Sequence, residues 1–218
     1  MTADLRTTRL RPAGYREMQW RNGGGSTTEI AIEPAGAGLQ AGPRFLWRLS
    51  MARVHKDGPF SCFAGYDRTL VLLEGSGVRL DFGAAAPPVT LAAPLAAVAF
   101  AGEWSTDCRL LDGPIRDFNL MVDRKRGAGR VEVFALAAQG RAEVQLRGYT
   151  GLLFVARGAV GVQLGDTREI EAVAELEAAR FDRDTAGSPI QFALTAIDGP
   201  AQMLWMDIEL RQPGSAPY

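Results

Sequence analysis

Short runs in which apolar and polar side chains alternate restrict the possible folds of this chain more than any other feature. In residues 45–54, with the sequence FLWRLSMARV, Trp47, Leu49 and Met51 alternate with Arg48, Ser50 and Ala52. Alternation over such a length is typical of a β-strand that packs one face against a core. Similar runs occupy residues 69–80 and 115–122, and Asp112-Gly113-Pro114 is a turn sequence beside them. The pattern predicts an all-β protein.

The second half of the chain repeats the outline of the first. Asp112-Gly113-Pro114 recurs as Asp198-Gly199-Pro200, and each half contains a glycine-marked break between two apolar runs. At nearly the same offset, two further residues of the first half have counterparts in the second: Phe100 in Phe181 and Met121 in Met206. This order predicts duplication of one all-β unit, and chance similarity between two β-meanders is the alternative.

The two halves differ in polarity at comparable places. The first half carries polar side chains near its expected strand ends, namely Arg48, Ser50, Ser61, Asp67, Arg68, Asp117 and Asn119. The end of the second half, residues 201–208, is mostly apolar. If both halves form barrels, we expect the first to be hollow and polar and the second to be filled by its own side chains.

Composition argues against several classes of function. The chain has 218 residues, enough for one large or two small domains. Its formal net charge of −1 offers no electrostatic basis for binding nucleic acid or an anionic membrane. It contains no apolar run of about 18 residues and no secretory leader pattern. We therefore expect a cytoplasmic protein with neither a nucleic-acid nor a membrane partner.

The supply of metal-binding side chains is small. His55 is the only histidine of the sequence, and Cys62 and Cys108 are its only cysteines. Metal sites built on imidazole or thiolate normally need two or more such ligands. A carboxylate-only oxygen site for a hard cation stays open, although no EF-hand spacing appears. We expect no metal and no cofactor, and we expect His55 to shape a strand end.

A glycine-rich segment follows the polar N-terminal region. Residues 20–29, WRNGGGSTTE, contain three consecutive glycines, which are costly to order and favour a place where the backbone needs positive φ or approaches another group closely. Trp20 and Asn22 put an aromatic plate and a hydrogen-bonding amide beside that backbone. The alternative is a tight Asn-Gly turn that opens a hairpin. The spacing does not match a phosphate-binding loop.

Taken together, these segments resemble the HutD/Ves family. The matching sequences are WRNGGG at 20–25 with Thr28-Glu29, WRLS at 47–50, DGPFS at 57–61, FAGYDR at 63–68, LEGSG at 73–77, and GP at 113–114 with DFNLM at 117–121. They follow one another between residues 10 and 125, whereas residues 131–218 match only in general β character. Ala64 stands where we expect proline in the family.

The resemblance implies a bicupin, with two cupin-like β-barrels or jelly rolls in one bacterial, cytoplasmic chain. We expect the first barrel, with the polar motifs, in residues 1–125 and the second, more apolar barrel in residues 126–218. This boundary is approximate and compatible with an exchange of terminal strands. The family is associated with histidine utilisation, which implies a regulatory or ligand-binding role in histidine breakdown. Cupin metal sites use a histidine cluster with a glutamate, so a single histidine predicts a polar pocket without metal.

Such a pocket would bind a small carboxylate of the histidine, urocanate or formylglutamate class. Arg48 and Arg68 could hold the carboxylate in a bidentate manner, because guanidinium geometry matches that group. Asp57 or Asp67 could accept a hydrogen bond from an amide or imidazole N–H. The predicted ligand-binding residues are Trp20, Asn22, Gly24, Thr28, Arg48, Ser50, Asp57, Ser61, Phe63, Asp67, Arg68 and Asn119.

Two other functions remain open on the sequence. One is a metal-free isomerase or lyase acting on an amino-acid or sugar derivative, with its acid and base drawn from Asp57, Asp67, Glu74 and His55. The other is a non-catalytic scaffold whose polar residues satisfy turns and ion pairs. Cupins often pair through their sheets, so an apolar face of the second barrel would suit a homodimer.

Overall fold

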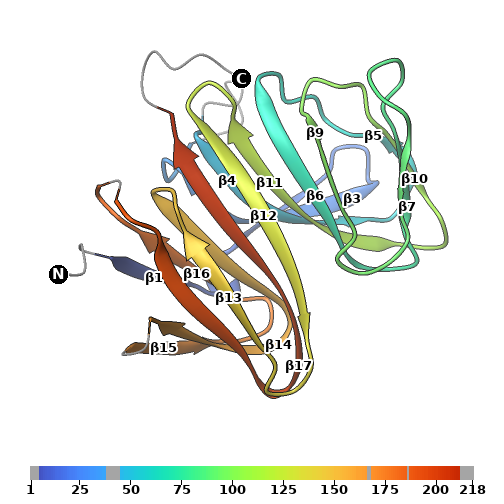
Figure 1. The fold of residues 1–218 in the computed structure, drawn as a ribbon. Coiled ribbons are helices and arrows are strands. Elements are labelled where there is room, and N and C mark those ends of the chain that lie inside the picture. The colour runs from blue at the N-terminus through green and yellow to red at the C-terminus, as the bar shows by residue number, and fades with distance from the viewer. Residues whose placement is uncertain (1–4, 38–44, 166–167, 186, 212–218) are drawn as a thin grey trace. The chain divides into compact units, whose positions relative to one another are not determined.

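The computed structural model describes residues 5–37, 45–165, 168–185 and 187–211, and nearly all regular structure in them is β-strand (Figure 1). A short 3-10 turn, η1 at Pro12–Gly14, is the only helical element among these residues. No helix in the described part of the chain is long and apolar enough to cross a membrane. The prediction of an all-β protein is confirmed.

The described residues divide into two compact units. The first unit is Tyr15–Gly127, and the second unit combines residues 5–14 with residues 128–211. The second unit therefore contains β1 (Arg6–Leu10), which pairs antiparallel with β16 (Ala178–Asp182). A short strand from the start of the chain thus belongs to the sheet of the second half.

The first unit is a sandwich of two antiparallel sheets. The six-stranded sheet has the order β2-β3-β4-β11-β6-β9, with the bounds Arg16–Gln19, Gly25–Glu33, Trp47–Val54, Ile115–Asp123, Tyr66–Glu74 and Ala97–Ala101. The four-stranded sheet has the order β5-β10-β7-β8, with the bounds Gly58–Pro59, Asp107–Leu110, Val78–Asp81 and Val89–Leu91. Leu72 of β6 and Leu80 of β7 belong to one buried cluster, so the core lies between the sheets. This arrangement is a jelly roll of the cupin type.

The second unit is built on two long strands. Its sheet has the order β1-β16-β14-β17-β12, with β13 paired to β17 and β15 paired to β14. The remaining bounds are Gly127–Leu136 for β12, Arg141–Leu146 for β13, Thr150–Leu164 for β14, Arg168–Val173 for β15 and Ile190–Leu210 for β17. β14 pairs with β16 before an irregularity at residues 155–159 and with β15 after it. An apolar cluster that includes Phe181, Phe192 and Trp205 fills this unit.

Both units contain the same glycine contact. Gly75, with φ 100°, follows β6, and a Cβ built on it would lie 2.7 Å from the carbonyl oxygen of Pro114. Gly158 of β14, with φ 80°, would place a Cβ 2.6 Å from the carbonyl oxygen of Pro200. Positive φ and the close approach both require glycine, and each proline belongs to an Asp-Gly-Pro sequence. This shared geometry favours duplication over chance similarity.

The strand registers align the two units residue by residue. The pairing of β11 with β6 shifts so that Asp117 lies opposite Leu72, and the pairing of β17 with β14 shifts in the same way so that Met203 lies opposite Val155. Such a shift is a β-bulge, which is a feature that related units tend to share. Asp117 therefore corresponds to Met203, and later residues follow in step.

The two phenylalanines match as predicted. Phe100 pairs with Arg68 in the first unit, and Phe181 pairs with Gly151 in the second. Because Arg68 and Gly151 occupy the same place after the register shift, Phe100 and Phe181 are equivalent.

One predicted match was wrong by a residue. Met121 pairs with Arg68, and Asp207 pairs with Gly151. Met121 therefore corresponds to Asp207 and not to Met206. The shared residue type suggested Met206, although the spacing of the Asp-Gly-Pro turns points one position further along.

Candidate functional site

A cavity of about 430 Å³ lies against the six-stranded sheet of the first unit. Because alternate residues of a strand share a face, three neighbouring strands supply its floor: Arg48, Ser50 and Ala52 from β4, Asp117, Asn119 and Met121 from β11, and Arg68 from β6. The other lining residues come from β2, β3, β5 and two connecting segments, and they are Met18, Trp20, Arg21, Asn22, Thr27, Pro59, Phe60, Ser61 and Phe63. The polar face of β4 lines a cavity and not open solvent.

Arg48 and Arg68 lie on either side of Met121 in one row of the sheet. Met121 pairs with Arg48 on β4 and with Arg68 on β6. Two strand spacings separate the backbones of the two arginines by about 9–10 Å. Ser50 and Asn119 pair with each other in a neighbouring row. The sheet therefore brings two cations to one cavity and places an amide and a hydroxyl beside them.

Arg48 is buried, with 3% of its surface exposed. Its Nε donates to Glu29 Oε2 at 2.7 Å, and Glu29 Oε1 forms an ion pair with Arg16 Nη2 at 3.1 Å. A guanidinium carries five N–H groups, and within the described residues Arg48 forms this one hydrogen bond. Its Nη2 is buried without a partner. Arg48 therefore keeps most of its donors unmatched.

Arg68, with 5% of its surface exposed, lies among aromatic rings. Its Cζ is 4.9 Å from the ring centroid of Phe100, 5.5 Å from that of Phe63 and 5.7 Å from that of Phe60. Within the described part of the chain its one hydrogen bond runs from Nη1 to the carbonyl oxygen of Ser61 at 3.3 Å, and its Nε is buried without a partner. Cation–π contacts stabilise a cation without using its N–H groups, so these donors remain for a ligand.

The ionisable groups of the cavity perturb one another. Burial raises the pKa of Asp117 to about 7, against the opposing effect of the Arg68 charge. Burial lowers the pKa of Arg68 to about 10; the charge of Asp117 opposes this change and the like charge of Arg48 adds to it. Burial, followed by the charges of Asp117 and Asp57, raises the pKa of the Cys108 thiol to about 12. The cavity thus holds two cations that repel each other and one carboxyl that ionises near neutral pH.

Most of the predicted site residues line this cavity. They are Trp20, Asn22, Arg48, Ser50, Ser61, Phe63, Arg68 and Asn119. The glycine-rich segment contributes two of them because it forms the turn between β2 and β3, closed by a 2.9 Å hydrogen bond from Trp20 N to Gly25 O. A Cβ at Gly25 would collide with the carbonyl oxygen of Arg53, which explains a glycine there. The turn holds a polar rim beside the cavity.

The other predicted residues, Gly24, Thr28, Asp57 and Asp67, do not line the cavity. Gly24 N donates to Asn22 Oδ1 at 3.0 Å and so helps to shape the turn. Thr28 follows Thr27, which does line the cavity, and neighbouring side chains of a strand take opposite faces. Asp57 Oδ1 accepts from Leu110 N at 2.8 Å and so fixes the end of β10.

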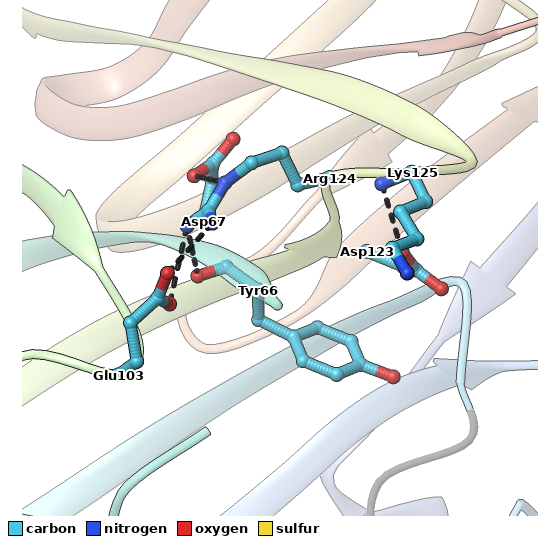
Figure 2. A network of polar contacts seen from close by, with 6 residues as sticks. All are labelled: Tyr66, Asp67, Glu103, Asp123, Arg124 and Lys125. Atoms are coloured by element: carbon cyan, nitrogen blue, oxygen red, sulfur yellow. Dashed lines mark hydrogen bonds and ion pairs between the residues drawn. The ribbon is translucent and has the colours of Figure 1, made fainter. Parts of the chain in front are cut away.

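Asp67 belongs to a surface network around Arg124 (Figure 2). Arg124 Nε donates to Asp67 Oδ1 at 2.7 Å, and Arg124 Nη1 donates to Glu103 Oε1 at 2.7 Å. Arg124 Nη2 also reaches the carbonyl oxygen of Tyr66 at 3.2 Å. The side chain of Asp67 is 53% exposed. Asp67 precedes Arg68 on β6, and the change of strand face separates the surface network from the cavity.

Sequence reasoning did not include Asp117, Phe60 or Met121 in the site. The available signal was parity, meaning the odd or even position of a residue along its strand. Asp117, Asn119 and Met121 occupy alternate positions of one strand and must share a face. Phe60 follows the Asp57-Gly58-Pro59 turn and carried no such signal. The described residues hold no group of three His, Cys, Asp or Glu side chains that could bind a metal ion.

The second unit carries a larger depression of about 550 Å³ on β13 and β17, with lining residues that include Arg141, Glu143, Arg147 and Gln191. Arg141, Glu143 and Arg147 are exposed. Charges in contact with water gain little from an added ion pair. The cavity of the first unit is the stronger candidate because its two arginines are already desolvated.

Comparison with known proteins places the chain in a family. The sequence model of HutD matches residues 12–199. The chain belongs to the HutD family. An uncharacterised 21.2 kDa protein from the hutC 3′ region of Pseudomonas putida is 38% identical over 174 residues, which are 79% of this HutD-family chain and 85% of that protein.

Solved structures support the same assignment. A conserved protein of unknown function from Pseudomonas aeruginosa PAO1 superposes with a TM-score of 0.81 at 35% identity, over 94% of this chain and 99% of that one. HutD from Pseudomonas fluorescens SBW25, determined in a formate condition, gives 0.76 at 29% identity over 95% and 100%. A cupin 2 conserved barrel domain protein from Leptotrichia buccalis gives 0.51 at 10% identity over 89% and 96%, which shows the fold alone. The predicted cupin-like fold of this HutD-family chain is confirmed.

Proposed function

We propose that this HutD-family bicupin binds a small carboxylate in the cavity of the first unit without a metal and acts in the cytoplasm as a regulator of histidine catabolism. The ligand belongs to the histidine, urocanate or formylglutamate class. The observation that carries the proposal is the pair of buried guanidinium groups on one cavity, each with one hydrogen bond among the described residues.

The charges of the site favour an anion. Arg48 and Arg68 are close enough for the charge of one to lower the pKa of the other. A carboxylate between them would relieve this repulsion and accept from the unmatched N–H groups, in the bidentate geometry that guanidinium groups offer. The volume of about 430 Å³ lies within the range of small-molecule sites, roughly 300–1,000 Å³.

The choice of ligand class rests on the relatives. The Pseudomonas putida relative comes from the region 3′ of hutC, and the Pseudomonas fluorescens relative is HutD. Both names point to histidine utilisation. Intermediates of histidine breakdown carry a carboxylate, which is the group that two arginines would recognise.

A thermal-shift screen of the metal-free protein against histidine, urocanate, formylglutamate, glutamate and formate tests this function. A ligand that binds only the folded state raises the melting temperature in a saturable way. We expect such a shift in the wild type and its loss in Arg48→Met and Arg68→Met, which remove the charge and replace the unbranched stem of arginine by one of similar flexibility. Arg116→Met is the matched control, because Arg116 also lies on the six-stranded sheet but pairs with Glu74. The absence of a shift with every compound would leave the scaffold alternative, whereas equal shifts in all variants would mean that the ligand binds away from the two arginines and would overturn the proposed site.

A second candidate function is isomerase or lyase chemistry on the bound ligand. The observation that favours it is Asp117, a carboxyl on the cavity with a pKa of about 7, the range suited to a general acid or base. The acids and bases predicted from the sequence, namely Asp57, Asp67, Glu74 and His55, do not line the cavity. Incubating a binding ligand with protein and following it by NMR would test this function. Turnover that Asp117→Asn abolishes, with binding retained, is the expected result of catalysis.

A further inference from the structure

We infer that the cavity takes up its carboxylate together with one proton, and that Asp117 holds that proton. This inference rests on the proposed function, because it concerns the same site and the same class of ligand. It adds a coupling between ligand binding and pH, and it gives the one carboxyl on the cavity floor a role that Arg48 and Arg68 cannot fill.

When Asp117 is ionised, the buried charges around it sum to zero before a ligand arrives. Arg68 faces it from β6 and is its counter-charge. Arg48 on β4 is already paired with Glu29 of β3, through the 2.7 Å contact of Nε with Oε2. Cys108 faces it from β10 as a neutral thiol, because its pKa is raised to about 12. The buried charges therefore compensate each other in two ways: Arg48 and Glu29 form a direct ion pair, whereas the charges of Arg68 and Asp117 act on each other across the cavity without a direct contact.

A carboxylate ligand upsets this balance. It brings one negative charge to the cavity and takes over the neutralisation of Arg68. Asp117, with 2% of its surface exposed, would then be a buried carboxylate without a counter-charge. An isolated buried charge is strongly disfavoured, and such a group takes up a proton instead. With Asp117 neutral, the ligand and the buried groups Arg48, Glu29 and Arg68 together return to zero net charge; Arg21, which also lines the cavity, is exposed to solvent.

The proton is available at little cost near neutral pH. Burial has already raised the pKa of Asp117 to about 7 in the free protein. The proton comes from solvent and forms an O–H bond on the Asp117 carboxyl, with no other bond made or broken. A neutral Asp117 is a hydrogen-bond donor and can donate to the ligand carboxylate. An ionised Asp117 would repel that carboxylate.

Calorimetric titration with formate tests the coupling, because formate stays ionised across the pH range used. Titrations in buffers of different ionisation enthalpy give the number of protons taken up per formate bound. We expect nearly one proton at about pH 8, where free Asp117 is ionised, and none at about pH 5.5, where it is already protonated. We also expect the affinity for formate to fall about tenfold per pH unit above about pH 7.

The asparagine of Asp117→Asn is neutral at every pH used. We therefore expect the formate affinity of this variant to be independent of pH and its proton uptake to be absent. NMR of the aspartate carboxyl carbons in the wild type gives the pKa of Asp117 with and without formate, and this readout does not depend on the variant. Saturable binding with no proton uptake would overturn the inference while leaving the proposed function intact, as would uptake that persists in Asp117→Asn. Absence of formate binding at both pH values would overturn the inference as it applies to a simple carboxylate, and the proposed function would fall with it if the thermal-shift screen also finds no ligand.

Discussion

The two units share the same strand pairing with the same β-bulge, but one encloses a polar cavity and the other a filled apolar core. The residues that correspond to the cavity residues Arg68, Asp117 and Asn119 are Gly151, Met203 and Trp205 of the second unit. Where the first unit has a cation, the second has a glycine without a side chain. Where the first unit has a carboxyl and an amide, the second has a thioether and an indole. Whether a unit of this fold is hollow or filled therefore depends on a few inward positions, because the backbone pairing is the same.

Trp205 shows how the second unit is filled. A Cβ built on Gly151 would lie 3.0 Å from Trp205 Cη2, so the indole occupies space that a larger residue at position 151 would need. Its ring centroid is 5.2 Å from that of Phe192 and 5.8 Å from that of Phe181. Its Nε1 donates to Gln145 O at 3.2 Å, so the buried N–H is satisfied. Glycine and tryptophan together close the space that Arg68 and Asn119 leave open.

The largest expected effect follows from truncating this indole. Trp205→Ala should lower the free energy of unfolding by about 3–5 kcal/mol, because it removes a fully buried side chain and leaves a cavity. The matched variant Asn119→Ala should change it by less than about 1 kcal/mol, because the Asn119 carbonyl oxygen has no partner to lose. Urea unfolding of both variants measures the difference. Equal losses would mean that the first unit depends on its polar residues for stability as much as the second depends on its core.

The strands of the first unit could be predicted because alternation and turn residues are local signals. The run at 45–54 contains β4, and the glycine break after Glu74 separates β6 from β7. Pairing order could not be predicted, because parity says which face a side chain takes and not which strand lies beside it. β1 is the example, since it pairs with β16 from the far end of the chain.

The site was predictable to the extent that it depends on parity. Arg48, Ser50 and Asn119 take the inward positions of their strands and line the cavity. Asp67 was misleading because it neighbours Arg68 in sequence but belongs to the opposite face. Asp117 had the correct parity, but its raised pKa depends on burial, which comes from packing between sheets and leaves no local trace in the sequence.

The pH dependence of stability tests the cost of keeping Asp117 in a hollow unit. Burial raises its pKa from 3.8 to about 7, so the folded state binds this proton more tightly than the unfolded chain does. Its contribution to stability is complete below about pH 4 and is lost as the pH rises to about 7. Asp117→Asn stays neutral, so above pH 7 it should be more stable than the wild type by up to about 4 kcal/mol. Urea unfolding across this range measures the gap, and a gap that does not change with pH would contradict the raised pKa.

Converting the cavity floor of the first unit toward that of the second is the next test. Arg68→Met combined with Asp117→Met replaces two buried charges by apolar side chains, and such replacements are often neutral or stabilising by about 1–4 kcal/mol. We expect the double variant to unfold at equal or higher urea concentration than the wild type and to lose all ligand-induced thermal shift. The single variant Arg68→Met is the control, because it leaves Asp117 without its counter-charge and should be the less stable of the two above about pH 7. A double variant that is less stable than this control would show that the charges support the fold itself.

The smallest expected effect concerns Asp67, which the sequence placed in the site and the strand face places outside it. Asp67→Asn weakens one contact of Arg124, whose guanidinium keeps Glu103 and the carbonyl oxygen of Tyr66. Exposed ion pairs contribute about 0–1 kcal/mol, so the free energy of unfolding should fall by less than about 1 kcal/mol. Ligand binding should be unchanged, because the loss of a charge on the outer face of β6 is screened by solvent from the cavity. Loss of the ligand-induced thermal shift in Asp67→Asn would mean that the anion binds at the outer face of β6. The contrast between the polar interior of the first unit and the apolar interior of the second would then not explain where the ligand binds.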